Sequence, residues 1–173
     1  EGFSSSSYLP FNLQRFQIYD QLINGAVGIT FLYANFISIN DYHWQQITRL
    51  SKELSSLILI LLEPEFYDEW SINNDKIEIM MKKHDGKIYL FAASTYYEDL
   101  VNIKITLDNK YKIKTIKVIN EFENGDINNP KTRTIIPDSL NSFTDNFIGE
   151  YDSAHSILAP GYAVHVYEIE YEP

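Results

Sequence analysis

Residues 26–33 of this chain read Ala-Val-Gly-Ile-Thr-Phe-Leu-Tyr. The stretch is almost continuously apolar and is rich in residues that favour strands, which is typical of a strand covered on both faces. Such a strand needs neighbouring strands on its two edges and helices over its faces. The stretch therefore predicts a buried strand inside an α/β unit.

Helical patterns flank this stretch on both sides. After Pro10, apolar residues recur at steps of three and four, which predicts a helix over residues 12–24 that ends before Gly25. Asp41 is a suitable N-cap for a second helix that continues to residue 62 with the same spacing. One strand and two helices cannot close a sheet. We therefore expect residues 1–62 to end an α/β domain whose other strands lie upstream, or come from a partner such as a second copy that covers strand 27–33.

The pattern changes to period-two alternation after about residue 76. Ile77, Ile79 and Met81 alternate along the chain, and Asp85-Gly86 is the dipeptide of a tight hairpin. In the last segment Val164 and Val166 point to one face, and the residues between them to the other. Further alternating segments are expected at residues 101–107, 113–122, 132–136, 142–147 and 162–171. Six or seven short antiparallel strands predict a β-sandwich over residues 77–173.

Residues 63–76 join the two parts and are rich in carboxylates near residues 63–70. General acid and base carboxylates normally sit opposite each other across a substrate, on separate strands. Neighbours within one segment rarely reach that arrangement, so we interpret these residues as a linker. The predicted fold class is α+β.

Composition narrows the classes of function. The chain has 173 residues, with 14 Lys and Arg against 24 Asp and Glu, and a formal net charge of −10. This acidic balance argues against a nucleic-acid site. The longest apolar run, residues 57–62, is too short for a membrane span. Cysteine is absent and the four histidines lack ligand spacing, so we expect neither a metal site nor a cofactor.

Polar and aromatic residues follow the predicted strand directly. Tyr33, Asn35 and Phe36 come at its carboxyl end, where the ligand crevice of an α/β sheet lies. We therefore predict them as substrate-binding residues. In the alternative interpretation, Tyr33 and Phe36 only complete the wall of the sheet and Asn35 turns the loop.

The first part of the chain resembles the end of the (β/α)8 barrel in clan-A-like glycoside hydrolases. Residues 9–19 (LPFNLQRFQIY) and 24–29 (NGAVGI) resemble their seventh helix and eighth strand. Residues 44–54 (WQQITRLSKEL) are similar to their eighth helix. The resemblance implies that residues 1–62 are the terminal helix-strand-helix of an α/β barrel.

The resemblance continues into the β-sandwich that follows such barrels. Residues 85–93 (DGKIYLFAA) with 101–105 (VNIKI) look like its hairpin, and residues 143–147 (FTDNF) with 162–169 (YAVHVYEI) look like its closing strands. Two features depart from the family: residues 93–95 lack the usual asparagine, and residues 148–161 are longer than the family pattern.

The family carries its catalytic glutamates on barrel strands four and seven, upstream of everything in this chain. The resemblance therefore implies a C-terminal, non-catalytic portion of a glycoside-hydrolase-like protein, with a β-sandwich that supports the barrel. No catalytic residue is carried over. Carbohydrate would bind through the upstream barrel, with contacts from Tyr33, Asn35 and Phe36.

Two other interpretations stay open. The chain is alternatively a free-standing carbohydrate-binding β-sandwich module, for which Tyr96, Tyr97 and Tyr111 are candidate stacking rings. The third interpretation is a complete small enzyme that uses carboxylates such as Asp145 and Glu168.

Overall fold

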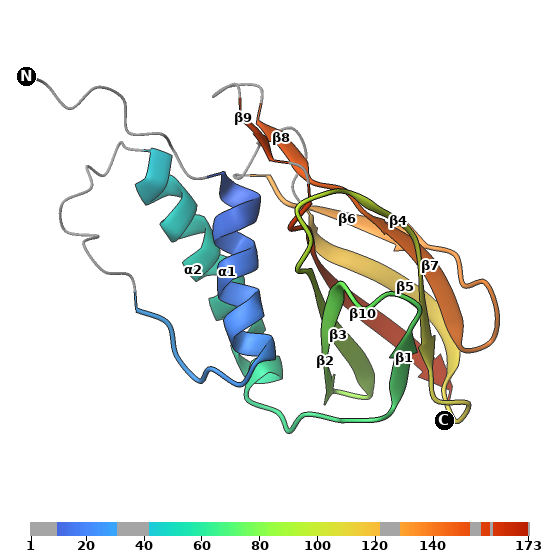
Figure 1. Ribbon diagram of the computed structural model, residues 1–173. Helices are drawn as coiled ribbons and strands as arrows, with labels where there is room; N and C mark the ends of the chain where they lie inside the picture. The colour runs from blue at the N-terminus through green and yellow to red at the C-terminus, as the bar shows by residue number, and fades with distance from the viewer. Residues whose placement is uncertain (1–9, 31–41, 122–128, 153–156, 160, 173) are drawn as a thin grey trace, which may run out of the picture.

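Two helices pack against one side of a β-rich region in the computed structural model (Figure 1), which describes residues 10–30, 42–121, 129–152, 157–159 and 161–172. The helices are α1 (Phe11–Ile23) and α2 (Tyr42–Leu61). The strands are β1 (Trp70–Ile72), β2 (Ile77–His84), β3 (Lys87–Ser94), β4 (Leu100–Leu107), β5 (Lys112–Glu121), β6 (Lys131–Ile135), β7 (Ser142–Phe147), β8 (Glu150–Asp152), β9 (Ile157–Ala159) and β10 (Val164–Glu172). The predicted α+β class is confirmed.

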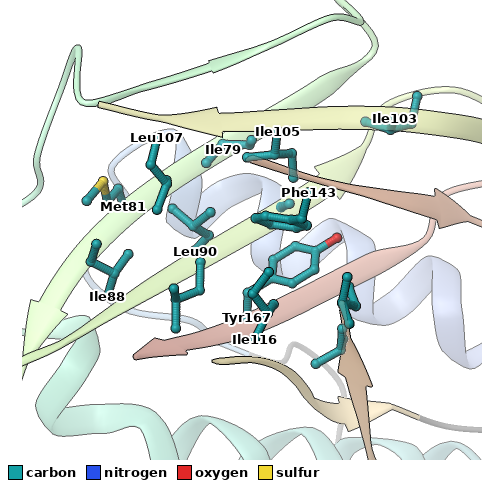
Figure 2. Packing of buried hydrophobic residues seen from close by; sticks show 14 of the residues in the cluster. Ile79, Met81, Ile88, Leu90, Ile103, Ile105, Leu107, Ile116, Phe143 and Tyr167 are labelled. Carbon is teal, nitrogen blue, oxygen red and sulfur yellow. The ribbon is translucent and has the colours of Figure 1, made fainter. Parts of the chain in front are cut away.

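The larger strands form two antiparallel sheets. One has five strands in the order β2-β3-β10-β5-β6, and the other has three in the order β1-β4-β7. Strands β8 and β9 pair with each other. Figure 2 shows Leu90 and Ile116 of the five-stranded sheet together with Ile105 and Phe143 of the other in one fully buried cluster. The core of the β region therefore lies between the sheets.

Turn chemistry and alternation explain the five-stranded sheet. Asp85 and Gly86 both have positive φ values, 48° and 73°, and join β2 to β3 as a two-residue hairpin. On β10, Val164 and Val166 pack toward the helices, whereas Tyr167 belongs to the core between the sheets. The predicted hairpin and the predicted faces of the last strand are confirmed.

The two helices run parallel to each other (Figure 1). Gln14, near the start of α1, bonds to Gln46 near the start of α2, and Tyr19, one turn further along α1, bonds to Glu53 further along α2. Tyr19 and Leu57 pack with residues of β2, β3 and β10 on the outer face of the five-stranded sheet. The helix pair therefore covers only part of that face.

The predicted strand over residues 26–33 is wrong across its described part. Residues 26–30 have no regular secondary structure, and Val27 is fully exposed. Ile29 packs partly against a cluster shared by both helices. All the named strands lie within residues 70–172, on the far side of the helix pair, so residues 26–30 have no neighbouring strand to pair with. Residues 31–33 lie outside the described residues.

The segment between the helices and the sheets is partly ordered by strand pairing. Within residues 63–76, expected as a linker, β1 pairs with β4, and Glu65 forms an isolated bridge with Lys82. Phe66 and Trp70 pack against the core between the sheets. The sheets therefore begin inside the segment interpreted as a linker.

Candidate functional site

The predicted substrate-binding residues Tyr33, Asn35 and Phe36 lie outside the described residues. Their contact with a sugar stays a prediction. Within the described residues, polar side chains gather in four places: at one end of the two sheets, between the helices, around Glu69, and in a groove beside α2.

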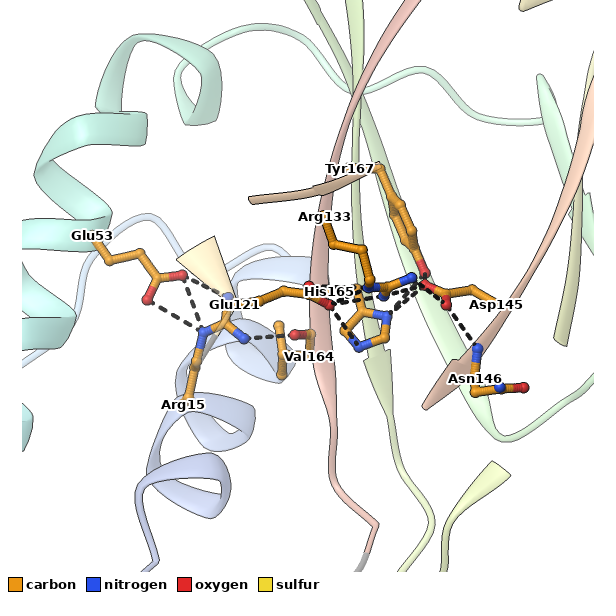
Figure 3. Close-up of polar contacts among 9 residues, drawn as sticks. All are labelled: Arg15, Glu53, Glu121, Arg133, Asp145, Asn146, Val164, His165 and Tyr167. Carbon is orange, nitrogen blue, oxygen red and sulfur yellow. Dashed lines mark hydrogen bonds and ion pairs between the residues drawn. The ribbon is translucent and has the colours of Figure 1, made fainter. Parts of the chain in front are cut away.

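Arg133 of β6 is the centre of the polar network at the end of the sheets (Figure 3). Its guanidinium donates to both carboxylate oxygens of Asp145 on β7, at 2.9 and 3.0 Å, and to Glu121 on β5, with a shortest distance of 2.8 Å. Tyr167 donates its hydroxyl to Asp145 at 2.9 Å, and His165 Nδ1 lies 3.0 Å from the same oxygen. The network therefore ties the two sheets together.

Asp145 is an ionised carboxylate in this network. Its burial would raise its pKa, but hydrogen bonds from His165 and Arg133 outweigh that effect and hold the pKa well below its usual range. The His165 ring stacks on Phe147 with centroids 4.5 Å apart, and its Nε2 atom lies 3.9 Å from Glu121. Because both ring nitrogens face carboxylates and the ring is buried, we interpret the His165–Asp145 pair as structural rather than as a catalytic dyad.

A second buried network joins the helices to the sheet. The Arg15 guanidinium donates to Glu53 at 2.8 Å, and the Tyr19 hydroxyl donates to the same carboxylate at 2.7 Å. Arg15 also donates to the carbonyl oxygen of Val164 on β10 at 2.5 Å. Figure 3 shows that Arg15 reaches β10 from the helix side, while the Arg133 network meets His165, the next residue along the strand. These contacts fix the helix pair on the β region.

Glu69, in the carboxylate-rich segment, accepts hydrogen bonds from several side chains of the β region. Lys83 and Lys110 donate to its two oxygens at 2.6 and 2.7 Å, and the Tyr111 hydroxyl donates to it as well. Burial would raise the pKa of Glu69, but hydrogen bonds from Lys110, Lys83 and Tyr111 lower it to about 2. Glu69 therefore anchors the chain where it enters the sheets.

The three candidate stacking tyrosines do not form one platform. Tyr111 is buried in the core between the sheets, so it cannot offer its face to a sugar. Tyr96 and Tyr97 contact each other with ring centroids 4.6 Å apart, and Tyr97 is 57% exposed. Only Tyr97 of the three is well exposed to solvent.

A groove of about 420 Å³ lies between α2 and strands β5 and β6. Leu57 and Ile60 line it from the helix, and Asn120, Thr132 and Glu168 line it from the sheet. This volume falls within the range of small-molecule sites.

Hydrogen bonds hold two of the polar groups in this groove. Glu168 accepts from Lys87 at 2.9 Å and from Tyr89 at 3.0 Å. Burial would raise the pKa of Glu168, but these two hydrogen bonds lower it. The pKa of Tyr89 rises to about 12, through burial and its bond to Glu168. Because its pKa is lowered, Glu168 is an ionised acceptor at neutral pH. The second polar group is Asn120, whose Oδ1 atom accepts a hydrogen bond from Arg49 at 3.4 Å.

Within the described residues, no three His, Asp or Glu side chains are grouped so that they could hold a metal ion. No helix in the described part of the chain is long and apolar enough to cross a membrane. Comparisons of the chain with protein-family models, with curated proteins and with solved structures find no match.

Proposed function

We propose that this chain is the C-terminal, non-catalytic portion of a glycoside-hydrolase-like protein, in which the two sheets support a (β/α)8 barrel. In this proposal residues 1–62 end the barrel and the catalytic residues lie upstream. Carbohydrate binds at the barrel, with Tyr33, Asn35 and Phe36 at its rim.

The parallel course of α1 and α2 is the observation that carries the proposal. Consecutive helices joined by a short loop pack antiparallel. Parallel consecutive helices need a segment that returns along their whole length, and in α/β units that segment is a strand. The chain between the two helices, residues 24–41, includes the apolar stretch 26–33, whose described residues 26–30 are not a strand in this structure. The helix pair therefore fits a piece of a βα repeat.

A second apolar face of α2 agrees with this proposal. Leu57 and Ile60 pack on or beside the five-stranded sheet, whereas Ile58 and Leu59 of α2 and Leu62, directly after it, are 49%, 64% and 74% exposed. Neighbouring apolar residues exposed on one helix face mark a surface that another element covers. In a barrel this face would contact the inner strands.

The attachment between the helices and the sheets also agrees with a supporting role. The buried Arg15–Glu53 pair and the Arg15 contact with Val164 join the helices to the sheets through groups that are shielded from solvent. Such an attachment holds the barrel end and the sheets in one fixed relation. The sheets would then stabilise the barrel without taking part in catalysis.

The test is to isolate the native protein that contains this chain and to assay it beside the 20.2 kDa chain alone. We expect a native mass of roughly 50–70 kDa, since a barrel has about 250 residues. The native protein should hydrolyse members of a panel of nitrophenyl glycosides and polysaccharides, and the chain alone none. Glycoside hydrolysis by the chain alone would overturn the proposal, as would a native mass near that of the chain.

A second assay tests the predicted rim residues in the native protein. Tyr33→Ala and Asn35→Ala should lower kcat/KM by about tenfold each, the cost of a lost hydrogen bond or stacking contact. Lys52→Ala is the control, because Lys52 is exposed on α2. Unchanged kinetics in both rim variants would remove these residues from the substrate site.

The alternative of a free-standing carbohydrate-binding module has the exposed ring of Tyr97 in its favour. Under this alternative Tyr97→Ala should reduce retention of the chain on polysaccharide affinity gels, whereas Tyr67→Ala, which also removes an exposed ring, should not. Equal retention of both variants and the unmodified chain would remove the module hypothesis.

A further inference from the structure

We propose that the groove between α2, β5 and β6 is a binding subsite for a neutral saccharide. The inference rests on the proposed function for its choice of ligand class. It gives the β region a carbohydrate contact of its own, apart from the barrel.

The groove exists because the helices leave part of the sheet uncovered. They pack mainly over β2, β3 and β10, so the outer faces of β5 and β6 remain open beside α2. The pairing of β5 with β6 shifts register between Val118 and Glu121, and Asn120 within this bulge has a φ of 57°. A bulge re-aims side chains and bends the strand. Here it places Asn120 on the wall of the groove.

The lining of the groove combines two kinds of chemistry. Leu57, Ile60 and Ile119 give an apolar surface, and Asn120, Thr132 and Glu168 give hydrogen-bonding groups. A sugar ring has the same division, with C–H groups on its faces and hydroxyls around its rim. Sites that bind small molecules combine apolar walls with a few fixed polar groups in this way.

The polar groups are held in place before a ligand arrives. Lys87 and Tyr89 fix the Glu168 carboxylate, and Arg49 fixes the amide oxygen of Asn120. With its oxygen engaged by Arg49, Asn120 can offer its Nδ2 group as a donor. Glu168 offers an acceptor, and the Thr132 hydroxyl offers either role. Groups that are already ordered lose less entropy on binding.

The charges of the groove favour a neutral ligand. Among the described residues, its charged lining side chains are Glu168 and Lys131, which have opposite signs. Lys87 further compensates Glu168 at 2.9 Å. The net charge of −10 on the chain disfavours an anionic ligand.

The experiment measures binding of the chain to maltotriose, cellotriose and xylotriose by saturation-transfer NMR and calorimetry. Glucuronate and inorganic phosphate are the charged comparison probes. Binding of at least one neutral trisaccharide, tighter than either charged probe, is the expected result. The absence of binding to all three, or tighter binding of a charged probe, overturns the proposal.

Matched variants locate the binding. Thr132→Val removes one hydroxyl, and Asn120→Gly removes the amide while it keeps a backbone that tolerates positive φ. Each should weaken binding by about fivefold, the effect of one hydrogen bond. Thr134→Val is the control, because Thr134 is exposed on the same face of β6 but does not line the groove. An equal loss with Thr134→Val, or none with either groove variant, overturns the assignment. Unchanged thermal unfolding shows that each variant is folded.

Failure of this inference and failure of the proposed function give different results. Trisaccharide binding at the groove with no glycoside hydrolysis by the native protein would overturn the barrel proposal and leave the subsite. Hydrolysis by a larger native protein, with no trisaccharide bound by the chain, would overturn only the subsite.

Discussion

Arg15 of α1 and Glu53 of α2 form a buried ion pair, with Nη2 and Oε1 2.8 Å apart and side chains that are 3% and 0% exposed. The pair sits where the two helices meet β10, because Arg15 also binds the carbonyl oxygen of Val164. Removal of one partner leaves the other charge in a dry environment. The pair therefore makes the helix attachment sensitive to single substitutions.

Glu53→Gln and Arg15→Met should each lower the free energy of unfolding by about 3–5 kcal/mol, because each leaves a buried charge without its partner. Urea unfolding measures this, with Lys52→Met on the exposed side of α2 as the control. The double variant should lose less than the sum of the single losses, since it leaves no lone charge. Additive losses would contradict the pairing.

Glu69 should make the protein sensitive to acid. Its pKa of about 2 lies below the ordinary value of 4.5 for a glutamate, so its contribution to stability is complete above about pH 4.5 and is lost as the pH falls toward 2. Glu69→Gln should cost about 2 kcal/mol at pH 7 and flatten the loss of stability between pH 4.5 and 2. Urea unfolding across this range measures both effects. Glu65→Gln is the control, because the Glu65 carboxylate accepts its hydrogen bond from the exposed Tyr67. An equal change in both variants of the pH dependence of stability between pH 4.5 and 2 would refute the role of Glu69.

Asp145 should hold the two sheets together through its charge. Asp145→Asn keeps the shape of the side chain but removes the charge that faces Arg133, so we expect a loss of about 2–4 kcal/mol. Tyr167→Phe keeps the charge of Asp145 and removes the hydroxyl that donates to Asp145 and lies 3.1 Å from His165 Nδ1, so it should cost about 1 kcal/mol. Chemical denaturation compares them, and equal losses would show that the charge contributes little.

The exposed face of α2 should drive association of the isolated chain. Leu59→Lys and Leu62→Lys should reduce self-association in sedimentation velocity while they leave the unfolding transition unchanged, because both side chains already lie in solvent. Leu57→Lys, on the buried side of the same helix, should unfold the chain instead. A monomeric unmodified chain at high concentration would argue against a missing neighbour on this face.

Gly161 should not tolerate a side chain. Its φ is 73°, and a Cβ atom there would clash with the backbone oxygen of Tyr96. Gly161→Ala should therefore cost more than about 2 kcal/mol in thermal or urea unfolding. Gly28→Ala has open space around it and should change stability by less than about 1 kcal/mol. Similar stability of the two variants would contradict the close approach.

The sequence predicts elements whose determinants are local. The hairpin at Asp85-Gly86 is set by two residues that adopt positive φ, and the faces of β10 follow from alternation. Apolarity and residues that favour strands predict a strand at residues 26–33, but a strand also depends on neighbours that this pattern does not contain. Local patterns therefore predict local structure better than they predict sheet partners.

Long-range polar contacts were the main features that the sequence did not predict. Arg133 and Asp145 are 12 residues apart, and Arg15 and Glu53 are 38 apart. One signal was available for Glu53, because a carboxylate among the apolar positions of the α2 face needs a buried partner. The sequence could not name Arg15 as that partner. The residue type of Tyr111 fits a stacking platform, but residue type does not distinguish a buried ring from an exposed one.

The position of β10 determines the order in which the β region can assemble. The hairpin β2–β3 and the neighbouring pair β5–β6 are close in sequence, so each can form locally as the chain leaves the ribosome. These two halves meet only through β10, the last strand to be synthesised among those described. Arg15 also finds its carbonyl acceptor only when β10 is in place. The high contact order of this arrangement should make folding of the β region slow.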